Sequence, residues 1–155
     1  MTERQKLIAY KQTVQAAKNK LKQMSGISIL ELLEHNENPG LNEMFSAYTT
    51  TFGNDIEPYS KLSYQSPAET VYSWLIGTMD LKENDEYYFY YGIWCRIKLL
   101  DLRLAIPSLW LHNGNTKGFL LAETDLSRML EAGSDSRDEY HYLIDIWNYS
   151  EQRNY

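Results

Sequence analysis

One histidine in this sequence is spaced from carboxylates in a way that could do chemistry. His141 follows Asp138 by three residues and precedes Asp145 by four. If residues 135–152 form a helix, the three side chains share one face, where an aspartate–histidine pair could bind a metal or orient a general base. Such spacings are common on exposed helices and no further set of ligands is recognisable, so we expect a solvated surface and no metal site.

Two other side chains could act as a base or a nucleophile. His112 precedes the turn-forming pair Asn113-Gly114 and is expected to be a polar turn residue. Cys95 follows Trp94 in the most apolar segment, where a cysteine is usually an inert core residue. The sequence contains neither a Gly-x-Ser-x-Gly nucleophile motif nor a phosphate-binding loop. We therefore expect no catalytic residue and no cofactor.

Tyrosines next to acidic residues point to a contact surface instead. The chain contains 13 tyrosines and 4 tryptophans, more than a core of this size needs. Acidic residues interleaved with tyrosine suit a surface that holds a basic protein through aromatic anchors and complementary charge. The alternative is a strand whose inward tyrosines are simply core. The expected partner-binding residues are Asp85, Glu86, Tyr87, Tyr88, Tyr90, Asp138, Glu139, Tyr140 and Tyr142.

Charge is unevenly distributed along the chain. Residues 1–24 hold six basic residues and one acidic residue, a net charge of +5, within a total of −6. The other 131 residues hold nine basic and twenty acidic residues, a net charge of −11. Such a body repels phosphate backbones, so we expect no nucleic-acid binding by the main fold and attraction to a basic protein. The basic N-terminal segment is a narrow exception.

Length and cysteine content predict one domain in a reducing compartment. The 155 residues are enough for one hydrophobic core, and 43% of them are hydrophobic. The single cysteine cannot form an internal disulfide. We see no signal peptide and no apolar run long enough to cross a membrane. We therefore expect a single domain, residues 1–155, in the cytoplasm and without membrane contact.

Helices are predicted for the first half of the chain. Residues 3–24 carry an apolar stripe with lysines around it, which indicates a basic amphipathic helix packed on its own domain. The stripe also fits a short coiled-coil seam, through which the chain could oligomerise as an adaptor. Further helices are expected at 28–34, at 41–52 and at 66–79, the last opened by the capping sequence Ser-Pro-Ala-Glu.

The second half predicts an antiparallel sheet. Residues 87–104 alternate between apolar and charged side chains with a slip at Leu99-Leu100, which favours one bulged strand or two strands at a bend over a helix. Residues 109–121 read as a hairpin with a glycine-rich tip, and 124–132 as a short helix. Residues 135–152 fit a strand, but a C-terminal helix is favoured. The expected core residues are Trp74, Trp94, Ile97, Leu102, Leu104, Trp110 and Leu120.

These expectations describe an α+β protein: N-terminal helices, then a small antiparallel sheet, then a C-terminal helix. Its small, acidic, tyrosine-rich character resembles that of bacterial immunity proteins and phage-type inhibitors, without any shared motif. The resemblance implies a protein that binds and neutralises a basic partner, such as a nuclease toxin or a defence enzyme, by covering its active site. The alternatives are a small enzyme or ligand-binding domain that uses His112 and His141 with carboxylates, and the adaptor.

Overall fold

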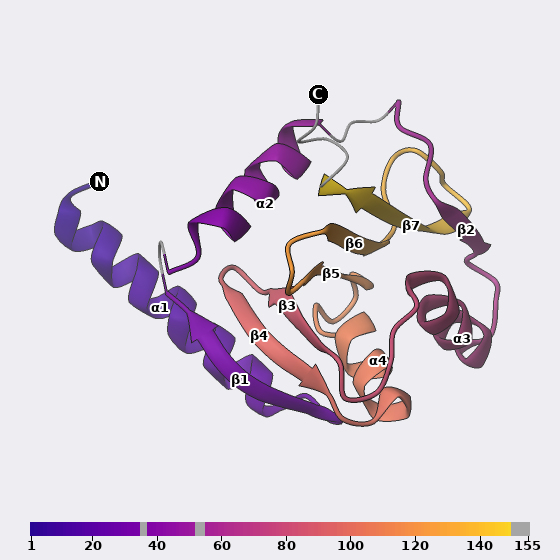
Figure 1. Cartoon of the computed structure of the whole chain (residues 1–155), viewed down its shortest axis with the longest axis horizontal. Helices are drawn as coiled ribbons and strands as arrows, with labels where there is room; N and C mark the ends of the chain where they lie inside the picture. Colours follow the sequence, from indigo (N-terminus) through magenta and orange to yellow (C-terminus); the bar gives the residue numbers. More distant parts are fainter. Residues whose placement is uncertain (35–36, 52–54, 150–155) are drawn as a thin grey trace.

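The computed structural model describes residues 1–34, 37–51 and 55–149, which form four α-helices and one seven-stranded sheet (Figure 1). The helices are α1 (Glu3–Lys22), α2 (Pro39–Thr51), α3 (Ala68–Met79) and α4 (Leu102–Trp110). The strands are β1 (Ile27–Leu33), β2 (Ser60–Ser63), β3 (Glu86–Tyr90), β4 (Trp94–Leu99), β5 (Gly118–Glu123), β6 (Arg128–Gly133) and β7 (His141–Asn148). The α+β class is confirmed, with a larger sheet than expected.

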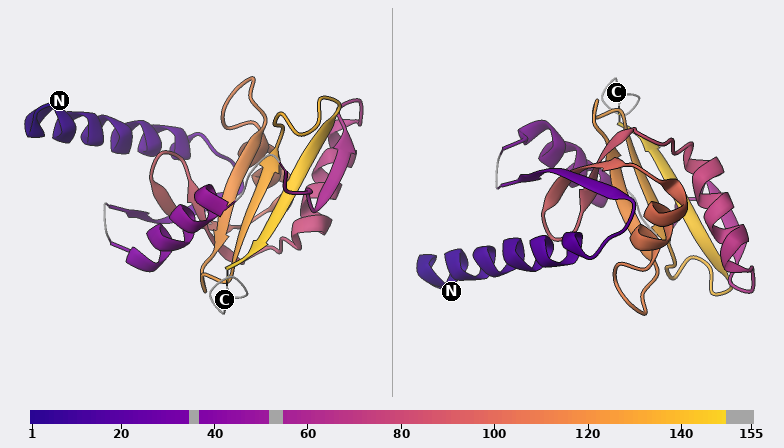
Figure 2. Two further views of the ribbon diagram at one scale, coloured as in Figure 1. Left: turned by 90° about the horizontal axis from the view of Figure 1, so that it is seen from above. Right: turned by 90° about the horizontal axis from the view of Figure 1, so that it is seen from below.

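Every neighbouring pair of strands in the sheet is antiparallel, in the order β1-β4-β3-β5-β6-β7-β2. Helices α1, α3 and α4 bury their apolar residues against one face, which we call the three-helix face. Helix α2 packs alone on the opposite face, the α2 face, against Trp94, Met129 and Trp147. Figure 2 shows α1 and α2 on opposite sides of β1. Because a single helix covers the α2 face, part of that face is open to solvent.

Helix α1 forms as predicted, but only its second half packs on the domain. Thr2 caps it, and the side chain of Gln5 accepts a hydrogen bond from the Thr2 backbone in return. Ala17 and Leu21 are buried, whereas Leu7 is 52% exposed. The first turns extend past the sheet (Figure 2). The apolar stripe is therefore longer than the surface that it covers.

The predicted C-terminal helix is wrong, because residues 141–148 form β7. This strand lies between β6 and β2 and is buried on both faces, with Tyr142 and Ile144 toward the three helices and Leu143 toward α2. Two neighbouring strands satisfy its backbone, and this pairing outweighs the helix signals in residues 135–139. Residues 150–152 of the predicted helix lie outside the described residues.

The predicted hairpin at 109–121 is also wrong. Leu109 and Trp110 end α4, in which Ile106, Leu109 and Trp110 are buried at helical spacing. Only the second half of that segment is a strand, β5, and its partners are β3 and β6. The helices expected at 28–34 and 124–132 are instead strands β1 and, after a turn, β6. Each gains backbone hydrogen bonds from a neighbouring strand, β6 from β5 and β7, and β1 from β4 with a register shift between Ile29 and Glu31.

Other expectations for the second half are confirmed in part. Residues 87–104 do contain two strands, but they meet at a turn around Gly92 and not at Leu99-Leu100, where the bulge or bend was expected. At Leu99-Leu100 the chain leaves the sheet, and residues 102–104 begin α4, which Asp101 caps. The expected core residues Trp94, Ile97, Trp110 and Leu120 are buried, and Trp74 and Leu102 are partly buried. Leu104 was expected in the core, but it is 51% exposed because it lies on the outer side of α4.

The sequence predicts no segment that crosses a membrane, and the helices of the structure can be compared with this expectation. None of the four helices in the described part of the chain is both long and apolar enough to cross a membrane.

Candidate functional site

A cleft of about 600 Å³ lies on the α2 face, beside α2 and over β5, β6 and β7. Strand register explains its position. Helix α2 packs over the cross-strand row formed by Tyr88, Ala122, Met129 and Trp147. Two positions farther along each strand, Leu120 pairs with Glu131, and Glu131 pairs with Asp145. These three residues line the cleft, so its floor changes from apolar to acidic across the sheet.

The next row of the sheet contains two glycines, which have no side chains to fill the space above the strands. Gly118 pairs with Gly133, and Gly133 pairs with Leu143. Gly118 has φ +141°, and a Cβ there would lie 2.5 Å from the carbonyl oxygen of Ala132, so this position requires glycine. With two adjacent glycines, the α2 face has few atoms to fill this part of the cleft.

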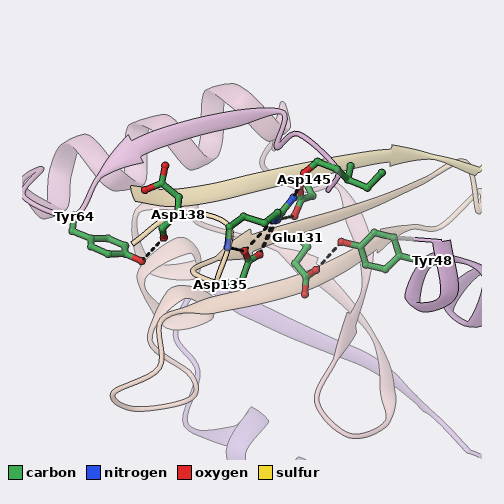
Figure 3. A network of polar contacts seen from close by, with 8 residues as sticks. Tyr48, Tyr64, Glu131, Asp135, Asp138 and Asp145 are labelled. Atoms are coloured by element: carbon green, nitrogen blue, oxygen red, sulfur yellow. Dashed lines mark hydrogen bonds and ion pairs between the residues drawn. The ribbon is translucent and has the colours of Figure 1, made fainter. Parts of the chain in front are cut away.

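Two sets of polar contacts lie at the acidic end of the cleft, one around Glu131 and one around Arg137 (Figure 3). The Tyr48 hydroxyl at the end of α2 donates a 2.6 Å hydrogen bond to Glu131 Oε1. Beside it, the guanidinium of Arg137 contacts Asp145 through Nη1 at 3.0 Å and Nη2 at 2.6 Å. The same guanidinium donates to Asp135 and to the carbonyl oxygen of Ile56. The side chains of Arg137 and Asp145 are 8% and 5% exposed, so this is a buried ion pair.

The carboxylates in this site differ in electrostatic state. Hydrogen bonds from Arg137 hold the pKa of Asp135 below its usual value. Burial raises the pKa of Glu131, and the charges of Asp145 and Asp135 raise it further, whereas the Tyr48 hydrogen bond and the charge of Arg137 oppose the shift. In Figure 3 one Glu131 oxygen meets Tyr48 and the other points away from it. Among the described residues, no lysine or arginine forms an ion pair with Glu131. Glu131 is therefore a partly buried carboxylate without an ion-pair partner among the described residues, although Arg137 lies near enough for its charge to lower the pKa of Glu131.

The opposite wall of the cleft contains a buried histidine. His112 is 6% exposed, its ring packs edge-on to Phe89 with centroids 5.0 Å apart, and its Nδ1 has no hydrogen-bond partner in the described chain. Burial, helped by the charge of Lys20, lowers the pKa of His112 to about 4, so the ring is neutral at pH 7. The ring was expected to be a polar turn residue and is instead part of the cleft wall.

Only one of the nine expected partner-binding residues, Tyr90, lines this cleft. Two of the others are buried on the three-helix face, at 4% and 8% exposure: Tyr87 and Tyr142. Tyr88 is half-buried near α2, where its hydroxyl accepts a hydrogen bond from Asn38. The remaining five lie in two separate exposed or loop segments: Asp85 and Glu86 at the far end of β3, and Asp138, Glu139 and Tyr140 before β7. The structure does not bring the nine residues into one surface.

The other candidates from the sequence are also dispersed. His141 contacts Asp138 through Nδ1 at 2.9 Å, and Lys61 contacts the same carboxylate at 3.3 Å, but neither His141 nor Asp138 lines the cleft. Cys95 is fully buried, and burial raises the pKa of its thiol to about 12. It therefore lacks the thiolate that nucleophilic chemistry needs.

Sequence reasoning missed the residues that build the acidic end. Glu131 and Asp145 each lie in the middle of an apolar run, Met129–Ala132 and Leu143–Ile146. A charge in the centre of a buried strand is costly unless it has a partner or a function, so this pattern was a usable signal. The contribution of Tyr48 could not be seen this way, because it lies 83 positions from Glu131.

Within the described residues, no group of three or more histidine, cysteine, aspartate or glutamate side chains could hold a metal ion. Arg137 occupies the space between Asp135 and Asp145 where a cation would have to bind. Comparisons with protein-family models, with curated proteins and with solved structures found no match.

Proposed function

We propose that this chain is a protein-binding protein that neutralises a basic partner by receiving one of the partner's arginine or lysine side chains in the cleft beside α2. The observation that carries this proposal is Glu131. It is a carboxylate with a raised pKa, no ion pair within the described part of the chain and one oxygen directed away from Tyr48. A guanidinium or ammonium group supplied there would form a charge-assisted hydrogen bond and favour the ionised carboxylate.

The surroundings of Glu131 suit a basic side chain in two further ways. Three carboxylates outnumber the two cations of the cleft lining, Arg137 and Lys117, within a body of net charge −11 beyond residue 24. Phe45, Tyr48 and Tyr90 line the same cleft and offer ring faces on which a guanidinium can stack. A cleft of about 600 Å³ is large enough for such a side chain and its neighbours.

Binding of this kind would neutralise a partner that works through a basic surface. A nuclease must attract phosphate with lysine and arginine, so a protein that captures one of these residues competes with the nucleic acid. The acidic charge of the whole chain would guide it to such a surface. These properties support an inhibitor of a nuclease toxin or of a basic defence enzyme.

Selection of random twelve-residue peptides displayed against the immobilised protein tests the proposal. We expect the wild-type protein to enrich peptides that contain arginine or lysine, and Glu131→Gln to lose that enrichment. The matched control is Glu69→Gln, an exposed glutamate in the first turn of α3, which should behave as wild type. Enrichment without basic residues, or enrichment unaffected by Glu131→Gln in a folded variant, would contradict the proposal.

A second candidate is an enzyme or receptor for a small cation. A carboxyl group with a raised pKa can serve as a general acid, and the neutral His112 ring lies in the same cleft. Calorimetry with free arginine, agmatine and spermidine distinguishes this function. Saturable binding of one of these that is tighter than binding of the selected peptides would favour the small-molecule site over the protein partner.

A further inference from the structure

A second cleft adjoins the first and differs from it in chemistry. It has a volume of about 340 Å³ and lies between α2, the end of β1, the β3–β4 turn and the middle of α1. Its lining is mixed: Leu33, Leu41 and Trp94 form an apolar part, and Glu34, Asn38 and Asn42 form a polar part. Phe45 and Tyr90, whose ring centroids are 4.7 Å apart, belong to the linings of both clefts. The two clefts therefore meet at this pair of rings.

The register of the sheet places both clefts along one line across the strands. Trp94 on β4 pairs with Tyr90 on β3. Phe89 pairs with Leu121, so Tyr90, one position farther, is next to Leu120 on β5. Leu120 in turn pairs with Glu131 on β6. A single row of side chains thus changes from aromatic and apolar at Trp94 to acidic at Glu131. Phe45 of α2 packs on Trp94 and Tyr90 where the two clefts meet.

Strand spacing gives the length of this row. Neighbouring strands lie about 4.8 Å apart, so the three steps from β4 to β6 span about 14 Å. An extended peptide advances about 3.4 Å per residue, so it covers this span in four residues. A helix advances about 1.5 Å per residue and would need about nine.

We propose that the two clefts form one groove for an extended segment of the partner, which carries an apolar side chain and, four residues away, an arginine or lysine. The segment runs across the strands beside α2, with the apolar side chain in the smaller cleft and the basic side chain at Glu131. This inference rests on the proposed function and specifies which part of a basic partner is recognised. His112 in the wall of the larger cleft is a second observation: its buried Nδ1 has no hydrogen-bond partner among the described residues and could bond a polar atom of a ligand.

A second copy of the chain fits the groove less well. A basic segment with exposed apolar residues is found, within the described ranges, at the start of α1, where Leu7 and Lys11 have the required spacing of four in sequence. In a helix, however, four residues span only about 6 Å, less than half of the distance between the apolar and acidic ends. The geometry therefore favours an extended segment of another protein.

Synthetic peptides of glycine and serine, with one leucine and one arginine, test this inference by fluorescence anisotropy. The two residues are separated by two, three, four or six positions. We expect the spacing of four to bind at least about tenfold more tightly than two or six, since only that spacing reaches both ends. Peptides with arginine alone should bind more weakly to the wild-type protein and should lose their binding to Glu131→Gln.

Two variants on the exposed side of α2 examine the apolar end. Asn42→Trp fills the smaller cleft, because Asn42 lines it, and should reduce binding of the best peptide to the level of the arginine-only peptide. Ser46→Trp is the matched control, since Ser46 is exposed on the same helix and lines neither cleft. This control should bind as wild type does.

The possible outcomes separate this inference from the proposed function. Equal binding at every spacing, with loss in Glu131→Gln, would overturn the groove and leave the proposed function standing. Absence of binding by all arginine peptides would overturn both. Sedimentation equilibrium gives the remaining outcome: self-association that disappears when residues 1–9 are deleted would assign the groove to a second copy and overturn an extended partner segment.

Discussion

At Glu131, stability and binding have opposite requirements. Because burial raises its pKa, the fold favours the protonated carboxyl. The associated stabilisation is fully present below the pKa of glutamate in the unfolded chain and is lost as the pH rises through the higher pKa of the folded protein. A group that binds a cation at neutral pH must be ionised, so the proposed binding uses the form of Glu131 that the fold favours less.

We therefore expect Glu131→Gln to raise the melting temperature by a few degrees at about pH 8 and to leave it nearly unchanged at about pH 3. Glutamine is neutral and can still accept the hydrogen bond from Tyr48. Calorimetry across this pH range provides the measurement, with Glu69→Gln on the surface as the control. A variant that melts at or below the wild-type temperature at about pH 8 would show that the charge of Glu131 is compensated in the folded chain.

Arg137 has a structural role beside this site. Its replacement by methionine would leave Asp145 buried at 5% side-chain exposure without its cation. We expect a loss of about 3–5 kcal/mol in the free energy of unfolding, measured in urea. Arg103→Met is the matched control, because Arg103 pairs with Asp101 at 92% exposure and should change stability by less than about 0.5 kcal/mol. Similar losses in the two variants would refute the assignment.

Among the elements, α1 offers a direct comparison within one helix. Leu21 is 4% exposed in the core, whereas Leu7 is 52% exposed on the extended first turns. Leu21→Ala should lower the free energy of unfolding by about 2–5 kcal/mol, through lost burial and the cavity left behind. Leu7→Ala should change it by less than about 0.5 kcal/mol. Denaturation in urea measures both, and a large loss for Leu7→Ala would mean that the first turns are covered in solution.

Local sequence predicted those elements whose signals are themselves local. The periodic segments α1, α2 and α3 were recognisable because apolar spacing and caps act within a few residues. Helix α3 nevertheless begins at Ala68 after Pro67, without the side-chain cap that was expected from Ser66. Strands β1, β6 and β7 were mistaken for helices because their identity depends on partners far away in sequence. Ile27 pairs with Leu99, for example, and Ser60 with Ile144. Such pairing outweighs weak helix propensity, and no local pattern reveals it.

The site was harder to predict than the fold for the same reason. Its floor is a cross-strand row, so its members are neighbours only through the register of β5, β6 and β7. Its depth depends on Gly118 and Gly133, which read in the sequence as turn or loop residues. The tyrosine-rich segment at 87–91 drew attention because of its composition, yet its alternate residues Tyr87 and Phe89 belong to the core.

At the scale of the whole molecule, charge should control how fast a complex forms. With a net charge of −6, the protein attracts a basic partner before contact. Raising the salt from low to physiological concentration should slow association several-fold, because screening there acts over about 8–10 Å. Stopped-flow measurements with the best-selected peptide provide the test. Association rates indifferent to salt would exclude electrostatic steering.

Charge reversal away from the cleft distinguishes long-range electrostatic attraction of the partner from direct contacts in the complex. Asp85→Lys with Glu86→Lys changes the long-range field at the far end of β3 and should slow association while dissociation stays the same. Glu131→Gln removes a contact and should mainly accelerate dissociation. If the double reversal instead accelerated dissociation, Asp85 and Glu86 would themselves contact the partner, as the sequence alone suggested.

The order of the strands also affects how the chain folds during its synthesis on the ribosome. Both edges of the sheet, β1 and β2, are made early, but their partners β4 and β7 are made much later. At a synthesis rate of about 5–20 residues per second, roughly 4–17 seconds pass between the synthesis of β2 and the completion of β7. During that time the apolar side of α2 lacks Met129 and Trp147, against which it packs in the finished fold. The nascent chain should therefore be a substrate for ribosome-associated chaperones until its last strand emerges.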